Sequence, residues 1–157
     1  SYPAESVAMM DRIIRRVESD PRWPEFVTIE GQGREDRDSD PIALAAKVAA
    51  DASRACALIA YTATGSTPMR LARERPLQQL VALTPNPAVA RRLALVWGIM
   101  SRIAPDPTGI EDMVQHASSA ASNLKLGKKG DRLVVVAGVP FGTPGSTNLI
   151  RMARIGG

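Results

Sequence analysis

The chain has 157 residues, a length that fits one domain and falls short of the about 250 residues that a (β/α)8 barrel needs. It is 45% hydrophobic and 23% charged, a composition that is typical of a globular protein and excludes disorder of the whole chain. The net charge of +4 comes from scattered basic residues, with only two each of Phe, Tyr and Trp. This pattern lacks the basic patch with stacking aromatics that marks nucleic-acid binding.

Membrane, metal and catalytic classes are also disfavoured by the sequence. No apolar run approaches about 18 residues and no signal peptide precedes the first expected helix, so we expect a cytoplasmic protein without a membrane segment. The single cysteine, Cys56, excludes an internal disulfide and suits a reducing compartment. His116 has no second histidine or cysteine nearby, so we expect no metal site. The sequence shows no nucleophile placed beside a general base, so no catalytic residue is predicted.

The first predicted element is a helix over residues 5–18. Its apolar residues recur at intervals of three and four, which places them on one stripe: Val7, Met10, Ile13, Ile14 and Val17. From residue 20 to residue 38, two prolines, two glycines and many charges predict a linker of weak order.

Helices and strands alternate after the linker. Three helices are predicted to begin with a polar cap followed by proline, at Asp40-Pro41, Thr67-Pro68 and Asn86-Pro87, and a fourth with a capping box over Thr108–Glu111. The helix after Asp40 is expected to bury Ile42, Ala45, Val48, Ala49 and Ala52. Short apolar runs predict strands at residues 57–62, 79–84, 99–104, 133–137 and 147–154.

The last strand sets the expected topology. It follows its predecessor after too few residues for a right-handed helical crossover, so it should run antiparallel, whereas the strands separated by helices should run parallel. The run Leu133–Ala137 is typical of a central strand that is covered on both faces. We predict a three-layer α/β/α sandwich with a five-stranded, mostly parallel sheet whose last strand is antiparallel.

Two loops rich in glycine and hydroxyl side chains form the candidate site. The first loop contributes Thr62, Thr64, Gly65, Ser66 and Thr67. The second contributes Gly138, Pro140, Gly142, Thr143, Gly145, Ser146 and Thr147. Both follow the carboxyl ends of parallel strands, where such sheets bind ligands, and the first opens a helix whose positive end favours a phosphate. The alternatives are a plain strand-to-helix turn and a wide hairpin connection.

Together with Arg70–Pro76 and Asn148–Gly156, these loops resemble the C-terminal domain of bacterial pyruvate kinases, and the likeness runs from Tyr2 to Gly156. The resemblance implies that residues 1–19 are the last helix of an absent (β/α)8 barrel, residues 20–39 a linker and residues 40–157 the regulatory domain. It implies a cytoplasmic homotetrameric parent that transfers phosphate from phosphoenolpyruvate to ADP with magnesium and potassium. The catalytic and ATP-binding groups belong to the barrel, so the fragment itself should hold no cofactor and be inactive.

The resemblance also implies a phosphorylated effector beneath the second loop and contact between C-terminal domains of neighbouring subunits. Relatives that sense fructose 1,6-bisphosphate hold its second phosphate with a tryptophan and an arginine, whose places fall here at Asp106 and Met113. Neither residue offers a cationic donor, so we expect a sugar monophosphate or AMP. Two alternatives stay open: a stand-alone phosphate-metabolite or nucleotide-binding α/β protein, and a domain that only holds subunits together.

Overall fold

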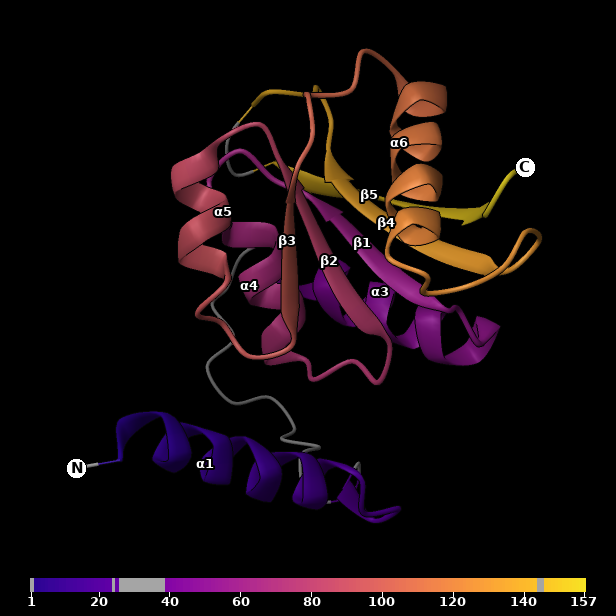
Figure 1. Ribbon diagram of the computed structural model, residues 1–157. Coiled ribbons are helices and arrows are strands. Elements are labelled where there is room, and N and C mark those ends of the chain that lie inside the picture. The colour runs from indigo at the N-terminus through magenta and orange to yellow at the C-terminus, as the bar shows by residue number, and fades with distance from the viewer. Residues whose placement is uncertain (1, 24, 26–38, 144–145) are drawn as a thin grey trace. The chain divides into compact units, whose positions relative to one another are not determined.

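The computed structural model describes residues 2–23, 25, 39–143 and 146–157, and the chain divides into two compact units, residues 1–32 and 33–157. The first unit contains α1 (Pro3–Glu18), which confirms the first predicted helix (Figure 1). Every residue of its apolar stripe is exposed, with Val17 the least exposed at 47%. Most of the predicted linker lies outside the described residues.

The second unit is built on a five-stranded sheet with the order β3-β2-β1-β4-β5. Its strands are β1 (Ala57–Tyr61), β2 (Gln79–Thr84), β3 (Ile99–Ile103), β4 (Arg132–Gly138) and β5 (Thr147–Arg154). The first four run parallel, and β5 pairs antiparallel with β4. The predicted topology, including the antiparallel last strand, is confirmed.

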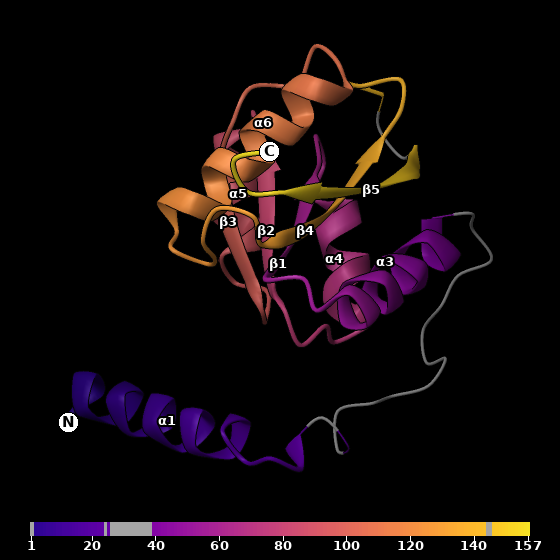
Figure 2. The ribbon, with the colours of Figure 1, turned by 90° about the vertical axis from the view of Figure 1, so that its right-hand side faces the viewer.

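Helices cover both faces of this sheet, as predicted. On one face lie α3 (Ser39–Ser53), α4 (Ser66–Arg73) and α5 (Pro87–Leu93), and on the other lies α6 (Ile110–Asn123) (Figures 1 and 2). The alternation of side chains along each strand supplies both cores. In β1, Leu58 packs toward α3, α4 and α5, whereas Ile59 packs toward Met113 of α6. All five residues of β1 are buried, as a central strand requires.

Two of the predicted helix caps are wrong. The helix α3 begins at Ser39 and α4 at Ser66, so Asp40 and Thr67 lie inside the first turns. The carboxylate of Asp40 accepts a hydrogen bond from Arg70 Nε at 2.9 Å and pairs with Arg73 at 2.8 Å. A buried carboxylate gains more from two guanidinium partners than from one backbone N–H. Only the cap at Asn86, whose side chain accepts from the first backbone N–H groups of α5, is confirmed.

The capping box and the inward face of α3 also differ from the prediction. The helix α6 has Gly109 at its cap position, and Asp112, not Glu111, reaches back to accept from the N–H of Thr108 at 2.8 Å. This hydrogen bond lowers the pKa of the Asp112 carboxyl. On α3 the fully buried apolar residues are Ala43, Ala46 and Ala50. Of the predicted residues, Ile42 and Ala49 are partly buried against the same core, whereas Ala45 and Ala52 are exposed and Val48 is 56% exposed. Small alanines permit a close approach to the sheet, which the larger valine would prevent.

Candidate functional site

The two candidate loops meet because the strands before them are neighbours. Strands β1 and β4 pair in parallel, so both loops leave the same edge of the sheet. They line a half-open cavity of about 40 Å³, room for roughly three water molecules. The cavity therefore suits a small polar group such as a phosphate.

Most of the predicted site residues line this cavity. From the first loop these are Thr62, Thr64, Ser66 and Thr67. From the second loop they are Gly138, Gly142, Thr143, Ser146 and Thr147. Gly65 and Pro140 are not among the lining residues, and Gly145 lies outside the described part of the chain.

Gly65 and Thr62 shape the first loop. The side-chain oxygen of Thr62 accepts a hydrogen bond from the N–H of Gly65 at 2.8 Å. Gly65 has a φ of +92°, and a Cβ atom there would lie 3.2 Å from Nη2 of Arg92. That guanidinium donates a hydrogen bond to the carbonyl of Thr64. The positive φ favours glycine at this position, and a side chain there would also displace the tip of Arg92.

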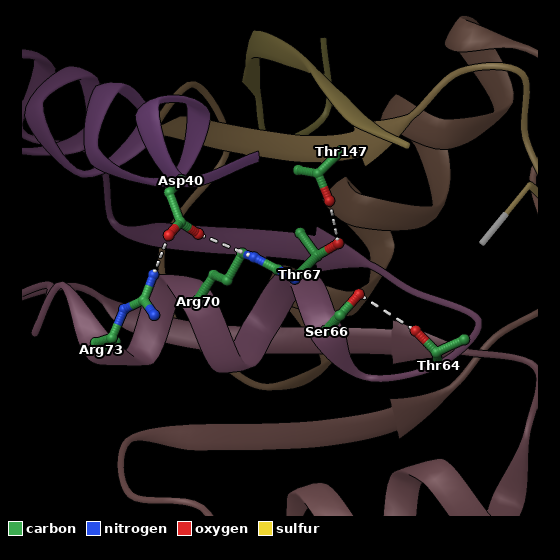
Figure 3. Close-up of polar contacts among 7 residues, drawn as sticks. All are labelled: Asp40, Thr64, Ser66, Thr67, Arg70, Arg73 and Thr147. Carbon is green, nitrogen blue, oxygen red and sulfur yellow. Dashed lines mark hydrogen bonds and ion pairs between the residues drawn. The ribbon is translucent and has the colours of Figure 1, made fainter. Parts of the chain in front are cut away.

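The first turn of α4 presents hydrogen-bond donors at the cavity. The N–H groups of Ser66 and Thr67 have no acceptor within the helix, because the first turn of any helix lacks them, and they carry the positive end of the helix dipole. The hydroxyls of Thr64 and Ser66 lie 3.2 Å apart at the rim (Figure 3). Backbone and hydroxyl groups of this kind bind anions without a neighbouring cation.

The basic residues of α4 do not contribute to this site. Arg70 and Arg73 pair with Asp40, which lies away from Thr64 and Ser66 in Figure 3. The side chain of Asp40 is only 2% exposed. Arg70 and Arg73 therefore belong to an ion-pair cluster around a buried carboxylate and are not free to bind an anion in the cavity.

The second loop is tied to the first through Thr147. Its hydroxyl lies 2.6 Å from the hydroxyl of Thr67, and both residues are buried (Figure 3). At the other end of the loop, a Cβ atom on Gly138 would lie 2.5 Å from the carbonyl oxygen of Ser146. The side chain of Asn148 bonds both backbone groups of Val139, at 2.8 and 2.7 Å. These contacts fix the ends of the second loop against the first.

Four lining residues were not predicted as parts of the site: Tyr61, Ala63, Pro107 and Phe141. The hydroxyl of Tyr61 donates to the carbonyl of Met113 at 3.1 Å, and burial raises the pKa of this phenol, so it stays protonated. Asp106 reaches the cavity from the segment after β3, at the position that the resemblance assigns to a contact with an effector's second phosphate. Met113, on the inward face of α6, is fully buried and is not among the lining residues.

The other reactive side chains, His116 and Cys56, do not line this cavity. Within the described ranges, no three His, Cys, Asp or Glu side chains gather as a metal site. Nε2 of His116 lies 3.2 Å from Oδ1 of Asp112. Cys56 is half-buried, and burial raises the pKa of its thiol. In the described part of the chain, no helix has the length and apolar character of a membrane span.

Fold and site thus define an α/β domain with a phosphate-sized cavity between two loops at the ends of parallel strands. The family described as pyruvate kinase, alpha/beta domain, matches residues 40–153. This chain belongs to that family.

Curated pyruvate kinases match nearly the whole chain. Those of Methylorubrum extorquens, Mycobacterium tuberculosis and Geobacillus stearothermophilus are 38%, 37% and 35% identical to it. These matches cover 98%, 99% and 96% of this chain, but only 32%, 32% and 26% of the relatives. The chain therefore spans about a third or less of the length of these relatives.

The contact between the two loops predicts a measurable coupling. Replacing Thr67 with Val should leave the buried hydroxyl of Thr147 without its partner and lower the free energy of unfolding by about 1–3 kcal/mol. In the double variant Thr67→Val, Thr147→Val, the loss of unfolding free energy should be smaller than the sum of the losses in the two single variants. Urea unfolding measures all three, with Thr64→Val, at an exposed position, as the control. Additive losses would contradict the coupling.

Proposed function

We propose that this chain is the effector-binding and subunit-assembly domain of a pyruvate kinase. The observation that carries the proposal is the convergence of two glycine and hydroxyl loops on a cavity of phosphate size at the start of α4. Membership of the family supports the assignment of the domain. The parent enzyme would transfer phosphate from phosphoenolpyruvate to ADP, giving pyruvate and ATP.

The effector's phosphate would bind the backbone N–H groups of Ser66 and Thr67 and the hydroxyls around them. Thr62 accepts a hydrogen bond from Gly65, so its own O–H remains to donate to an anion. In the pair Thr67 and Thr147, one hydroxyl donates to the other, and the hydrogen of the acceptor is left for the ligand. Each charge-assisted hydrogen bond contributes about 1.5–3 kcal/mol, so a few of them suffice for specific binding.

A carboxylate placed in the cavity should displace the anion. Ser66→Asp puts a negative charge where the phosphate would bind, and we expect it to abolish binding of ribose 5-phosphate in calorimetric titrations. Gln115→Glu, which adds the same charge at an exposed position of α6, is the matched control and should leave the affinity unchanged. Equal affinity of Ser66→Asp and the native chain would remove the proposed site.

The effector should carry one phosphate group, as a sugar monophosphate or AMP does. Asp106 lines the same cavity as the two loops, so its carboxylate faces the ligand and would repel a second phosphate. Calorimetry with glucose 6-phosphate, ribose 5-phosphate, AMP and fructose 1,6-bisphosphate should show that the bisphosphate binds most weakly. The variant Asp106→Asn should reduce the difference in affinity between the monophosphates and the bisphosphate. Tightest binding of the bisphosphate to the native chain would overturn this assignment.

The domain should also assemble through β5. This strand is at one edge of the sheet, and an open edge is a template for pairing with a second chain. We expect a two-fold dimer in sedimentation experiments, in line with a tetrameric parent. Met152 lies on β5 and is 43% exposed. Met152→Lys should raise the dissociation constant of the dimer by at least about tenfold, because a charged side chain on an edge strand opposes pairing with a second chain. The control is Met69→Lys on α4, 49% exposed, and equal effects of both variants would contradict the β5 interface.

Catalysis would belong to the part of the parent outside this chain. Magnesium and potassium, which the resemblance implies for the parent, would act there, together with the nucleotide, in the cytoplasm. The alternative is a stand-alone phosphate-metabolite-binding or nucleotide-binding protein of the same fold class. An assay of the chain with phosphoenolpyruvate, ADP and magnesium should give no pyruvate, and turnover would favour the alternative.

A further inference from the structure

A second, larger hollow lies between β3 and α6, on the sheet face that α6 covers. We call it the β3–α6 pocket; it is bounded by Leu83, Arg102, Ile103, His116, Ala120 and Leu124. Its volume is about 420 Å³, within the range of about 300–1,000 Å³ that is usual for small-molecule sites. It shares no lining residue with the phosphate-sized cavity, and nothing in the proposed effector site uses it.

The hollow follows from the way the layers are built. Three helices cover one face of the sheet, whereas α6 is the only helix packed on the other face among the described residues. It packs against β4 and β5, which leaves the same face of β3 at the sheet edge less covered (Figure 1). Arg102 is consequently exposed on that edge, while the floor of the pocket is formed by the buried side chain of Leu83.

The described residues that line the pocket include a positive charge and no negative charge. Arg102 is a lining cation, and no Asp or Glu is among the described residues that line the pocket. One nitrogen of its guanidinium donates to the carbonyl of Ser101 at 2.7 Å, and within the described chain it forms no ion pair. Its remaining donors are therefore available at the mouth of an apolar hollow.

His116 adds a polar group to the wall. Its Nε2 atom lies 3.2 Å from the carboxylate of Asp112, which holds the ring in place. Its Nδ1 atom is buried and has no hydrogen-bond partner among the described residues.

We propose that the β3–α6 pocket binds a small apolar monocarboxylate that has no ammonium group. The planar guanidinium of Arg102 matches a carboxylate through two parallel hydrogen bonds, and the apolar wall accepts a hydrocarbon body. An amino acid fits less well, because its ammonium would lie near the Arg102 cation and no Asp or Glu is among the described lining residues. Free phosphate fits less well, because the pocket offers it one guanidinium and a wall that is apolar apart from His116, Ser119 and Asn123.

The test uses 3-phenylpropionate as the probe and backbone amide NMR of the 157-residue chain as the readout. We expect saturable shifts over residues 102–105 and 116–124, and binding of L-phenylalanine at least about tenfold weaker, the factor that corresponds to 1.4 kcal/mol. Arg102→Gln should weaken the binding of 3-phenylpropionate by a similar factor. Arg91→Gln, an exposed arginine of α5 on the opposite face of the sheet, is the matched control and should change nothing.

Three results would overturn the proposal. The first is the absence of saturable shifts, and the second is a set of shifts confined to the phosphate-sized cavity. The third is equal affinity of the native chain and the Arg102→Gln variant. Because Arg102 is exposed, its replacement leaves the core intact, and the amide spectrum of the free variant verifies this directly.

Discussion

The buried contact between the hydroxyls of Thr67 and Thr147 is the constraint on which the site depends. It joins residues 80 positions apart in the chain and holds the start of α4 against the start of β5. Two buried hydroxyls without partners would each incur a desolvation penalty, so the loops are most stable when they touch. The parallel pairing of β1 and β4 brings the loops together, and this contact closes the cavity between them.

The candidate site would rely on dipoles and hydroxyls because the arginines of α4 are engaged elsewhere. Arg70 and Arg73, both partly buried, pair with the buried carboxylate of Asp40, unlike the exposed pair of Arg15 and Asp11 on α1, where solvent screens the charges. Removing one arginine would leave the buried charge of Asp40 less compensated, which is costly. Asp40 thereby fixes α4 against α3 without any contribution from the basic side chains of α4 to the candidate phosphate site.

The sequence predicted the sheet, its topology and most of the cavity wall, because buried strands and glycine loops leave strong local patterns. It predicted only part of the inward face of α3, since a helix with alanines on every side has no distinct apolar stripe, and Val48 is exposed instead of buried. Nor could it show that Asp40 pairs with distant arginines. Those contacts depend on tertiary geometry, as does the close approach that requires glycine at position 138.

The central claim is that a phosphate binds at the first turn of α4. Titration of the chain with ribose 5-phosphate, followed by backbone amide NMR, tests it most directly. We expect the amides of Ser66 and Thr67 to show the largest saturable shifts, because their N–H groups would donate to the phosphate. The amide of Gly138, on the facing loop, should shift with them. Saturable shifts centred on any other part of the chain, or none at these two amides, would contradict it.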